Sequence, residues 1–123
     1  MAYRAYKYTF KLHAAHNLDP LLSEQQAHYH TFKIVLYINN QKSGFVSYDD
    51  VEKIIDDYLK QYQGKYLNDT VSFKNLNQTI ENIGIVFYDH LRPITLSYGF
   101  NLLKLEISET PTRIFSISEK IIL

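Results

Sequence analysis

Near both ends of the chain, apolar and polar residues alternate, which is the pattern of half-buried β-strands. From Tyr6 to Ala14 every second residue is apolar, and Lys7, Thr9 and Lys11 stand between them. After a loop that contains NLDPLLSEQQ, the alternation resumes. The apolar row is then Phe32, Ile34, Leu36 and Ile38. We expect this second strand to be the antiparallel partner of the first.

The middle of the chain has a helical period instead. Ser47 and Asp50 resemble a capping box with Asp in the place of Glu, and apolar residues follow at helical spacing. These residues are Val51, Ile54, Ile55, Tyr58, Leu59 and Tyr62. The spacing predicts an amphipathic helix of about four turns, which Gly64 ends.

A second helix is predicted from about Thr79 to a stop at Pro93. Its apolar stripe is Ile80, Ile83, Phe87 and Leu91. Alternation then returns at Leu103, Leu105 and Ile107, and a fourth strand is predicted at 112–118 after a turn at Thr110-Pro111.

The predicted order is therefore ββααββ, an α+β fold. It gives a four-stranded, mostly antiparallel sheet with two helices on one face. At 123 residues, the chain fits one domain over residues 1–123. The uncovered face and the edge strands favour a homo-oligomer, because closing several sheets into a barrel would remove the edges.

Four of the five histidines fall near the adjoining ends of the first two strands. One more step along the apolar row of the first strand reaches His16, and the row of the second strand extends backwards to His30 and His28. Three imidazoles on one face can hold a metal, and nitrogen ligands with one open position favour catalytic zinc. Alternatively, each is a hydrogen-bonded core residue. His13 falls with the lysines and His90 lies off its helix's apolar stripe, so both are read as structural.

Glu109 continues the apolar row of the third strand. A carboxylate there is costly unless it is paired or binds something. The structural interpretation is a salt bridge to Arg113 or Lys104. The functional interpretation is a carboxylate that accepts hydrogen bonds from the amino and ring N–H groups of a ligand.

Composition narrows the possibilities. Thirteen basic and thirteen acidic residues give a formal net charge of zero, so no nucleic-acid partner is expected. The chain has no cysteine, so any metal must be held by His, Asp or Glu. No apolar stretch approaches the roughly 20 residues of a membrane span, and MAYRAYKYTF lacks a signal-peptide core. We therefore expect a soluble, cytoplasmic protein without a membrane partner.

Six short motifs occur in an order that resembles one enzyme family, over nearly the whole chain. They are AAHNL, HYH, GFVSYDDV, YLND, NQTIEN and SET. The chain is similar to the 6-pyruvoyltetrahydropterin synthase and 6-carboxytetrahydropterin synthase family of the tunnelling fold. The HYH motif has Tyr29 where the family usually has glycine, and NQTIEN has Gln78 in the place of proline.

The resemblance implies a fold, a cofactor and a substrate. It implies a barrel of stacked trimers, usually a hexamer, with active sites between subunits. Zn²⁺ held by His16, His28 and His30 would act on 7,8-dihydroneopterin triphosphate or a related pterin. Glu109 would hold the guanidine-like edge of the pterin through charge-assisted hydrogen bonds.

Two departures from the family pattern bear on catalysis. Glu24 stands where the family has its catalytic cysteine, and some members with glutamate there are associated with release of 6-hydroxymethyl-dihydropterin. Glu24 is therefore either the catalytic acid/base or a solvated loop residue. Gln63 and Gly64 replace the Asp-His pair of the proton relay, and neither can exchange a proton.

Three functional hypotheses remain. The first is a zinc-dependent pterin synthase-like lyase. The second is a non-catalytic member that binds zinc and pterin. The third is a structural oligomer in which the histidines serve only the fold.

Overall fold

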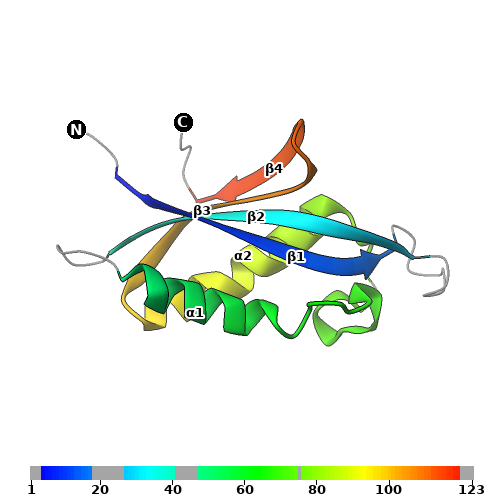
Figure 1. Ribbon diagram of the computed structural model, residues 1–123, viewed down its shortest axis with the longest axis horizontal. Coiled ribbons are helices and arrows are strands. Elements are labelled where there is room, and N and C mark those ends of the chain that lie inside the picture. Colours follow the sequence, from blue (N-terminus) through cyan, green and yellow to red (C-terminus); the bar gives the residue numbers. More distant parts are fainter. Residues whose placement is uncertain (1–3, 18–26, 41–46, 75, 120–123) are drawn as a thin grey trace.

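A four-stranded antiparallel sheet and two α-helices form the fold (Figure 1). The computed structural model describes residues 4–17, 27–40, 47–74 and 76–119. Within them, the strands are β1 (Tyr6–His16), β2 (His28–Asn40), β3 (Phe100–Thr110) and β4 (Arg113–Ser118), which lie in the sheet in this order. The helices α1 (Tyr48–Leu59) and α2 (Ile80–Ser97) lie on the same face of the sheet. The predicted ββααββ order is confirmed.

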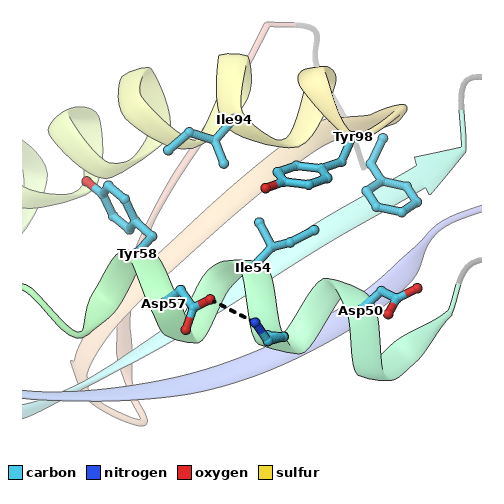
Figure 2. Close-up of a pocket in the computed structure, with 8 residues that line it drawn as sticks. Asp50, Ile54, Asp57, Tyr58, Ile94 and Tyr98 are labelled. Atoms are coloured by element: carbon cyan, nitrogen blue, oxygen red, sulfur yellow. Dashed lines mark ion pairs between the residues drawn. The ribbon is translucent and has the colours of Figure 1, made fainter.

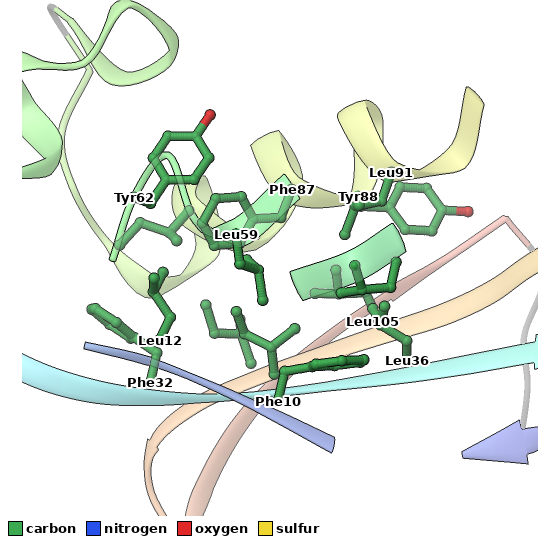
Figure 3. Packing of buried hydrophobic residues seen from close by; sticks show 14 of the residues in the cluster. Phe10, Leu12, Phe32, Leu36, Leu59, Tyr62, Phe87, Tyr88, Leu91 and Leu105 are labelled. Carbon is green, nitrogen blue, oxygen red and sulfur yellow. The ribbon is translucent and has the colours of Figure 1, made fainter. Parts of the chain in front are cut away.

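The hydrophobic core fills the space between the helices and the sheet (Figure 3). The alternation predicted for the first two strands is confirmed, because their apolar rows are buried. From the sheet these core residues include Phe10, Leu12, Phe32, Ile34 and Leu36. From the helices they include Val51, Ile55, Leu59, Ile83, Phe87 and Leu91. The sheet and the helices therefore share one core, which fixes the strand ends on which the histidines lie.

The start of α1 follows its sequence signal, but its end does not. Ser47 is the N-cap, and its side chain accepts a hydrogen bond from the Asp50 backbone N–H at 3.4 Å. The helix ends at Leu59, and Tyr62 beyond it is still buried. Gly64 follows with φ +71°, a left-handed conformation that favours glycine. Two short 3₁₀ helices, η2 (Leu67–Asp69) and η3 (Val71–Phe73), come next.

Pro93 does not end α2, contrary to the prediction from the sequence. The helix continues to Ser97, and Gly99 follows with φ +86°. Proline removes one helical hydrogen bond. The buried side chains of Leu91 and Thr95 on either side of it keep this turn packed on the core. Neither helix of the described residues is long and apolar enough to cross a membrane.

Gly84 sets how closely α2 approaches the sheet. A Cβ atom at this position would lie 2.9 Å from Ile107 Cγ2 and 3.1 Å from Phe115 Cδ2. These distances are shorter than ordinary carbon contacts of about 3.5–4.0 Å. The absence of a side chain therefore lets the middle of α2 lie against β3 and β4.

A bulge in the β2–β3 pairing shifts the apolar row of β3. Tyr37 pairs with Lys104, but the next residue, Ile38, pairs with Leu102. Leu102 is therefore buried where Leu103 was predicted to be, and Leu103 is only half-buried. Leu105 and Ile107 keep their predicted places in the core.

Candidate metal centre

Three histidines meet on one face where β1 and β2 adjoin. In the β1–β2 register, His16 lies opposite His28 and Ala14 lies opposite His30. Residues opposite each other or two apart share a face, so all three histidines lie on the core-facing side that the apolar rows predicted. The ring centres of His16 and His30 are 5.0 Å apart, and those of His28 and His30 are 6.3 Å apart. His16 is only 5 % exposed, whereas His28 is exposed.

Glu109 from β3 joins two of these histidines. Its Oε1 lies 3.3 Å from Nε2 of His16, and its Oε2 lies 3.9 Å from Nδ1 of His30. His16, His30 and Glu109 can each offer one ligand atom, and these three atoms lie within 4.8 Å of one another. His28 does not belong to this group. Lys104, one of the two cations considered as a partner for Glu109, pairs instead with Glu106 at 3.2 Å.

The hydrogen bonding of His16 assigns its tautomer. Its Nδ1 lies 2.7 Å from the backbone carbonyl of Gln78. A carbonyl only accepts, so Nδ1 carries the proton and Nε2 of the neutral ring presents its lone pair to Glu109. Burial lowers the pKa of His16 and outweighs the Gln78 carbonyl and the Glu109 carboxylate, which raise it. The neutral imidazole is therefore favoured.

This donor set fits a divalent cation. A lone pair of His16 and an oxygen of Glu109 face each other at 3.3 Å, and two acceptors at this distance repel unless a cation or proton lies between them. The Nδ1–H bond to the Gln78 carbonyl is the kind of outer contact that orients metal-ligating histidines. His16 and His30 could supply nitrogen ligands, and Glu109 an oxygen ligand.

Neighbouring loops hold His16 in place from both sides. Asn17 is buried next to it, donating its backbone N–H to Asn68 Oδ1 at 3.1 Å and its side-chain amide to Tyr66 Oη at 2.7 Å. Gln78 is also buried, and its side-chain amide donates to the carbonyls of Phe73 and Leu76. The carbonyl that orients His16 therefore belongs to a residue that is itself buried and hydrogen-bonded.

A cavity of about 330 Å³ opens beside Glu109. Its lining consists of Ile80, Glu81, Glu109, Thr110, Arg113, Ile114 and Phe115. Glu81 brings a second carboxylate to this cavity. The sequence carries no signal for Glu81 beyond its place in the motif NQTIEN.

A larger cavity of about 630 Å³ lies between the two helices (Figure 2). Ile54, Tyr58, Ile94 and Tyr98 point into it, and Lys53 pairs with Asp57 at its rim at 3.5 Å. None of the predicted site residues that the structure describes lines it. We therefore place the candidate site at the histidines and Glu109.

The remaining candidate residues are Glu24, His13 and His90. Glu24 is outside the described residues. The ring of His13 stacks on Tyr29 with 5.6 Å between ring centres, and its Nδ1 lies 3.3 Å from the Thr31 hydroxyl. The Nδ1 of His90 lies 2.7 Å from the Tyr58 hydroxyl. His13 and His90 thus have structural contacts, as predicted.

Comparison with known proteins decides the family. The family model for 6-pyruvoyl tetrahydropterin synthase matches residues 6–120. The chain belongs to the 6-pyruvoyl tetrahydropterin synthase family. Among curated proteins, no sequence matches it significantly.

Solved structures share the fold of this family member at low sequence identity. The 6-pyruvoyl tetrahydropterin synthase of Caenorhabditis elegans matches with a TM-score of 0.76 and 20 % identity, over 95 % of this chain and 96 % of the other. An uncharacterised protein from Wolinella succinogenes matches with a TM-score of 0.72 and 13 % identity, over 95 % of this chain and 98 % of the other. A 6-pyruvoyltetrahydropterin synthase of Plasmodium vivax matches with a TM-score of 0.67 and 13 % identity, over 96 % of this chain and 99 % of the other. It is described as a catalytic-residue mutant in which glutamate is changed to alanine.

In this family member, Gln63 and Gly64 are used to hold the edge of β1. The Gln63 side chain accepts from the His13 backbone N–H at 3.0 Å and donates to the Lys11 carbonyl at 2.9 Å. The backbone N–H of Gly64 donates to the His13 carbonyl at 2.7 Å. The left-handed conformation of Gly64 would strain a histidine. The place of the expected Asp-His pair therefore has a structural role here.

Proposed function

We propose that this chain is a zinc-dependent pterin synthase-like lyase that acts on 7,8-dihydroneopterin triphosphate or a related pterin. Membership of the family supports the reaction class. The observation that carries the proposal is the neutral, buried His16, with Nε2 directed at Glu109 beside a cavity. The Nε2 lone pair and the Glu109 oxygen are both acceptors, so a cation between them would satisfy both.

In this proposal His16, His28 and His30 hold the zinc ion. When bound, zinc acts as a Lewis acid that polarises the side-chain oxygens of the substrate and stabilises the negative charge that develops there. His16 contributes its oriented Nε2, and the buried Gln78 carbonyl keeps the ring in this tautomer. His28 lies at the exposed rim, opposite His16 in the strand register.

Carboxylates bind the ring of the substrate in this proposal. Glu109 accepts hydrogen bonds from the amino and ring N–H groups of the pterin, and Glu81 lines the same cavity. Two carboxylates suit a ring edge that presents several donors. A pterin would thereby place its side chain toward the histidines, because Glu109 lies next to both His16 and His30.

Glu24 is the proposed acid/base. A carboxylate can do this work when its surroundings raise its pKa toward neutrality. The description of a catalytic glutamate in the Plasmodium vivax relative supports an enzyme of this kind that uses glutamate. Gln63 cannot replace it, since its amide does not titrate and is bound to the β1 backbone.

The decisive experiment is incubation of the zinc-loaded protein with 7,8-dihydroneopterin triphosphate, followed by chromatography of the products. We expect release of triphosphate and a new pterin. Glu24→Gln should lower kcat by about 10²–10⁴-fold. Glu52→Gln, an exposed carboxylate on α1, is the matched control and should leave kcat unchanged. Turnover unaffected by Glu24→Gln would remove Glu24 from the mechanism.

The second candidate is a non-catalytic protein that binds zinc and pterin. The use of Gln63 and Gly64 to hold β1 favours it, because no proton relay remains at these positions. A wild-type protein that binds zinc and pterin without turnover would establish this function instead.

We also propose a homo-oligomer, either a trimer or a hexamer, with active sites between subunits. The edges of the described sheet, β1 and β4, support an assembly, because pairing with other copies would remove them. Light scattering after size-exclusion chromatography measures the assembly. A monomer at all concentrations would refute it.

A further inference from the structure

Glu109 lies within 4 Å of ring nitrogens of two histidines, His16 and His30. We propose that Glu109 is itself a metal ligand in the pterin-free protein, where it fills the position that the histidines leave open. This inference rests on the proposed metal site, and it gives Glu109 a second role beyond the ring binding proposed above.

One distance at this site is that of two ligands that share an ion. With zinc–ligand bonds of about 2.0–2.1 Å in a tetrahedral site, neighbouring ligand atoms are about 3.3–3.4 Å apart. His16 Nε2 and Glu109 Oε1 are 3.3 Å apart. His30 Nδ1 is 3.9 Å from the other oxygen, Oε2, and one ligand atom from each of the three residues lies within 4.8 Å of the others, so side-chain rotations would have to bring His30 to the same spacing.

The charges around Glu109 also call for a cation. Its side chain is only 28 % exposed, and its ion-pair partners among the described residues are His16 and His30. The Nδ1 of His16 donates to the Gln78 carbonyl, so its Nε2 and the Glu109 Oε1 face each other as two acceptors 3.3 Å apart. A bound divalent ion would satisfy both acceptors at once.

Glu106 shows what an ordinary carboxylate does on the same strand. It lies three residues earlier on β3, is 19 % exposed, and pairs with the Lys104 ammonium and the Tyr37 hydroxyl. Glu109 has no such lysine partner among the described residues. Glu106 therefore provides a matched control for Glu109.

A ligand role for Glu109 couples the metal to the pterin. A carboxylate oxygen that binds a metal is no longer free to accept a hydrogen bond from the pterin edge through the same lone pair. For both oxygens to accept from the ring, Glu109 would have to turn away from the metal. This would leave a ligand position for an oxygen of the substrate side chain.

The test uses Co²⁺ alone, whose visible absorption bands report the number and type of ligands. Wild type, Glu109→Gln, Glu109→Asp and Glu106→Gln are titrated with Co²⁺, and far-UV circular dichroism verifies folding. We expect Glu109→Gln to weaken Co²⁺ binding by about tenfold or more and to alter the bands. Glu109→Asp keeps the charge but withdraws the carboxylate by one methylene, and it should alter the bands as well. Glu106→Gln should match wild type.

Each other outcome overturns the inference. Weaker binding with unchanged bands in Glu109→Gln would mean that Glu109 acts only through its charge. Unchanged affinity and unchanged bands in both Glu109 variants would mean that it does not contact the metal. Turnover plays no part in this test, so a protein that fails as a lyase still decides it. A wild type that binds no Co²⁺ would overturn both this inference and the proposed metal site.

Discussion

Replacing Gly84 by alanine should destabilise the protein, although alanine is the better helix former. The new Cβ would lie 2.9 Å from Ile107 Cγ2 and 3.1 Å from Phe115 Cδ2. This is about 0.5–1 Å short of an ordinary carbon contact. Ile107 is fully buried and β-branched, so its side chain has little freedom to turn away. We therefore expect α2 to move away from the sheet.

Two opposing effects determine the magnitude. Overpacking of a core costs about 1–3 kcal/mol. The higher helix propensity of alanine returns about 1 kcal/mol. The net loss is therefore up to about 2 kcal/mol in the free energy of unfolding. For a chain of this length, a loss of 1 kcal/mol lowers Tm by about 3–5 °C.

A double-mutant cycle, measured by urea unfolding, isolates the contact. Ile107→Ala removes Cγ2 and should itself destabilise the protein by about 2–5 kcal/mol. In that background Gly84→Ala should cost less, and the difference is the coupling energy between the two positions. A Gly84→Ala variant with the same effect on stability in both backgrounds would refute the close approach described here.

Two further predictions concern β1. Burial raises the pKa of Tyr8 from 10.0 to about 12, so the unfolded chain loses the phenol proton at a lower pH than the folded chain does. The free energy of unfolding should therefore fall by about 1.4 kcal/mol per pH unit between these two values. Urea unfolding at pH 9 and at pH 11.5 measures this loss, which should be smaller in Tyr8→Phe than in wild type. Equal losses in the two proteins would contradict the burial of the hydroxyl. Gln63→Leu removes both side-chain hydrogen bonds to the β1 backbone and should lower the free energy of unfolding by about 1–2 kcal/mol, measured by thermal unfolding. An unchanged Tm would mean that water replaces these hydrogen bonds without loss.

The sequence could predict the elements whose own side chains define them. The rows of β1 and β2 and the cap at Ser47 depend on neighbours close in the chain, and the structure bears them out. The end of α2 was wrong because packing on both sides of Pro93 outweighs one missing hydrogen bond. The row of β3 was wrong at Leu103 because a bulge arises from pairing with β2, which local alternation does not encode.

Some features of the candidate site could be predicted from the sequence, and others could not. The shared face of the histidines followed from strand parity, because it depends only on the period of two. The contact of Glu109 with His16 could not be predicted, since Glu109 lies on β3 and reaches past β2 to β1. The role of Gln63 was also hidden, because its partner His13 is 50 residues away in the chain.

The outer edge of β1 limits how copies of this chain can join. Among the described strands β1 is an edge strand, and from Lys11 to Ala15 its outer side already binds the backbone or side chains of residues 63–65. At this edge, a strand from another copy could therefore extend the sheet only along the first half of β1. Any such seam stops before His16, so a neighbouring subunit can reach the histidines with side chains and loops but not by strand pairing. The segment that stands in the place of the expected Asp-His pair thus also keeps strand pairing away from the histidine end of β1.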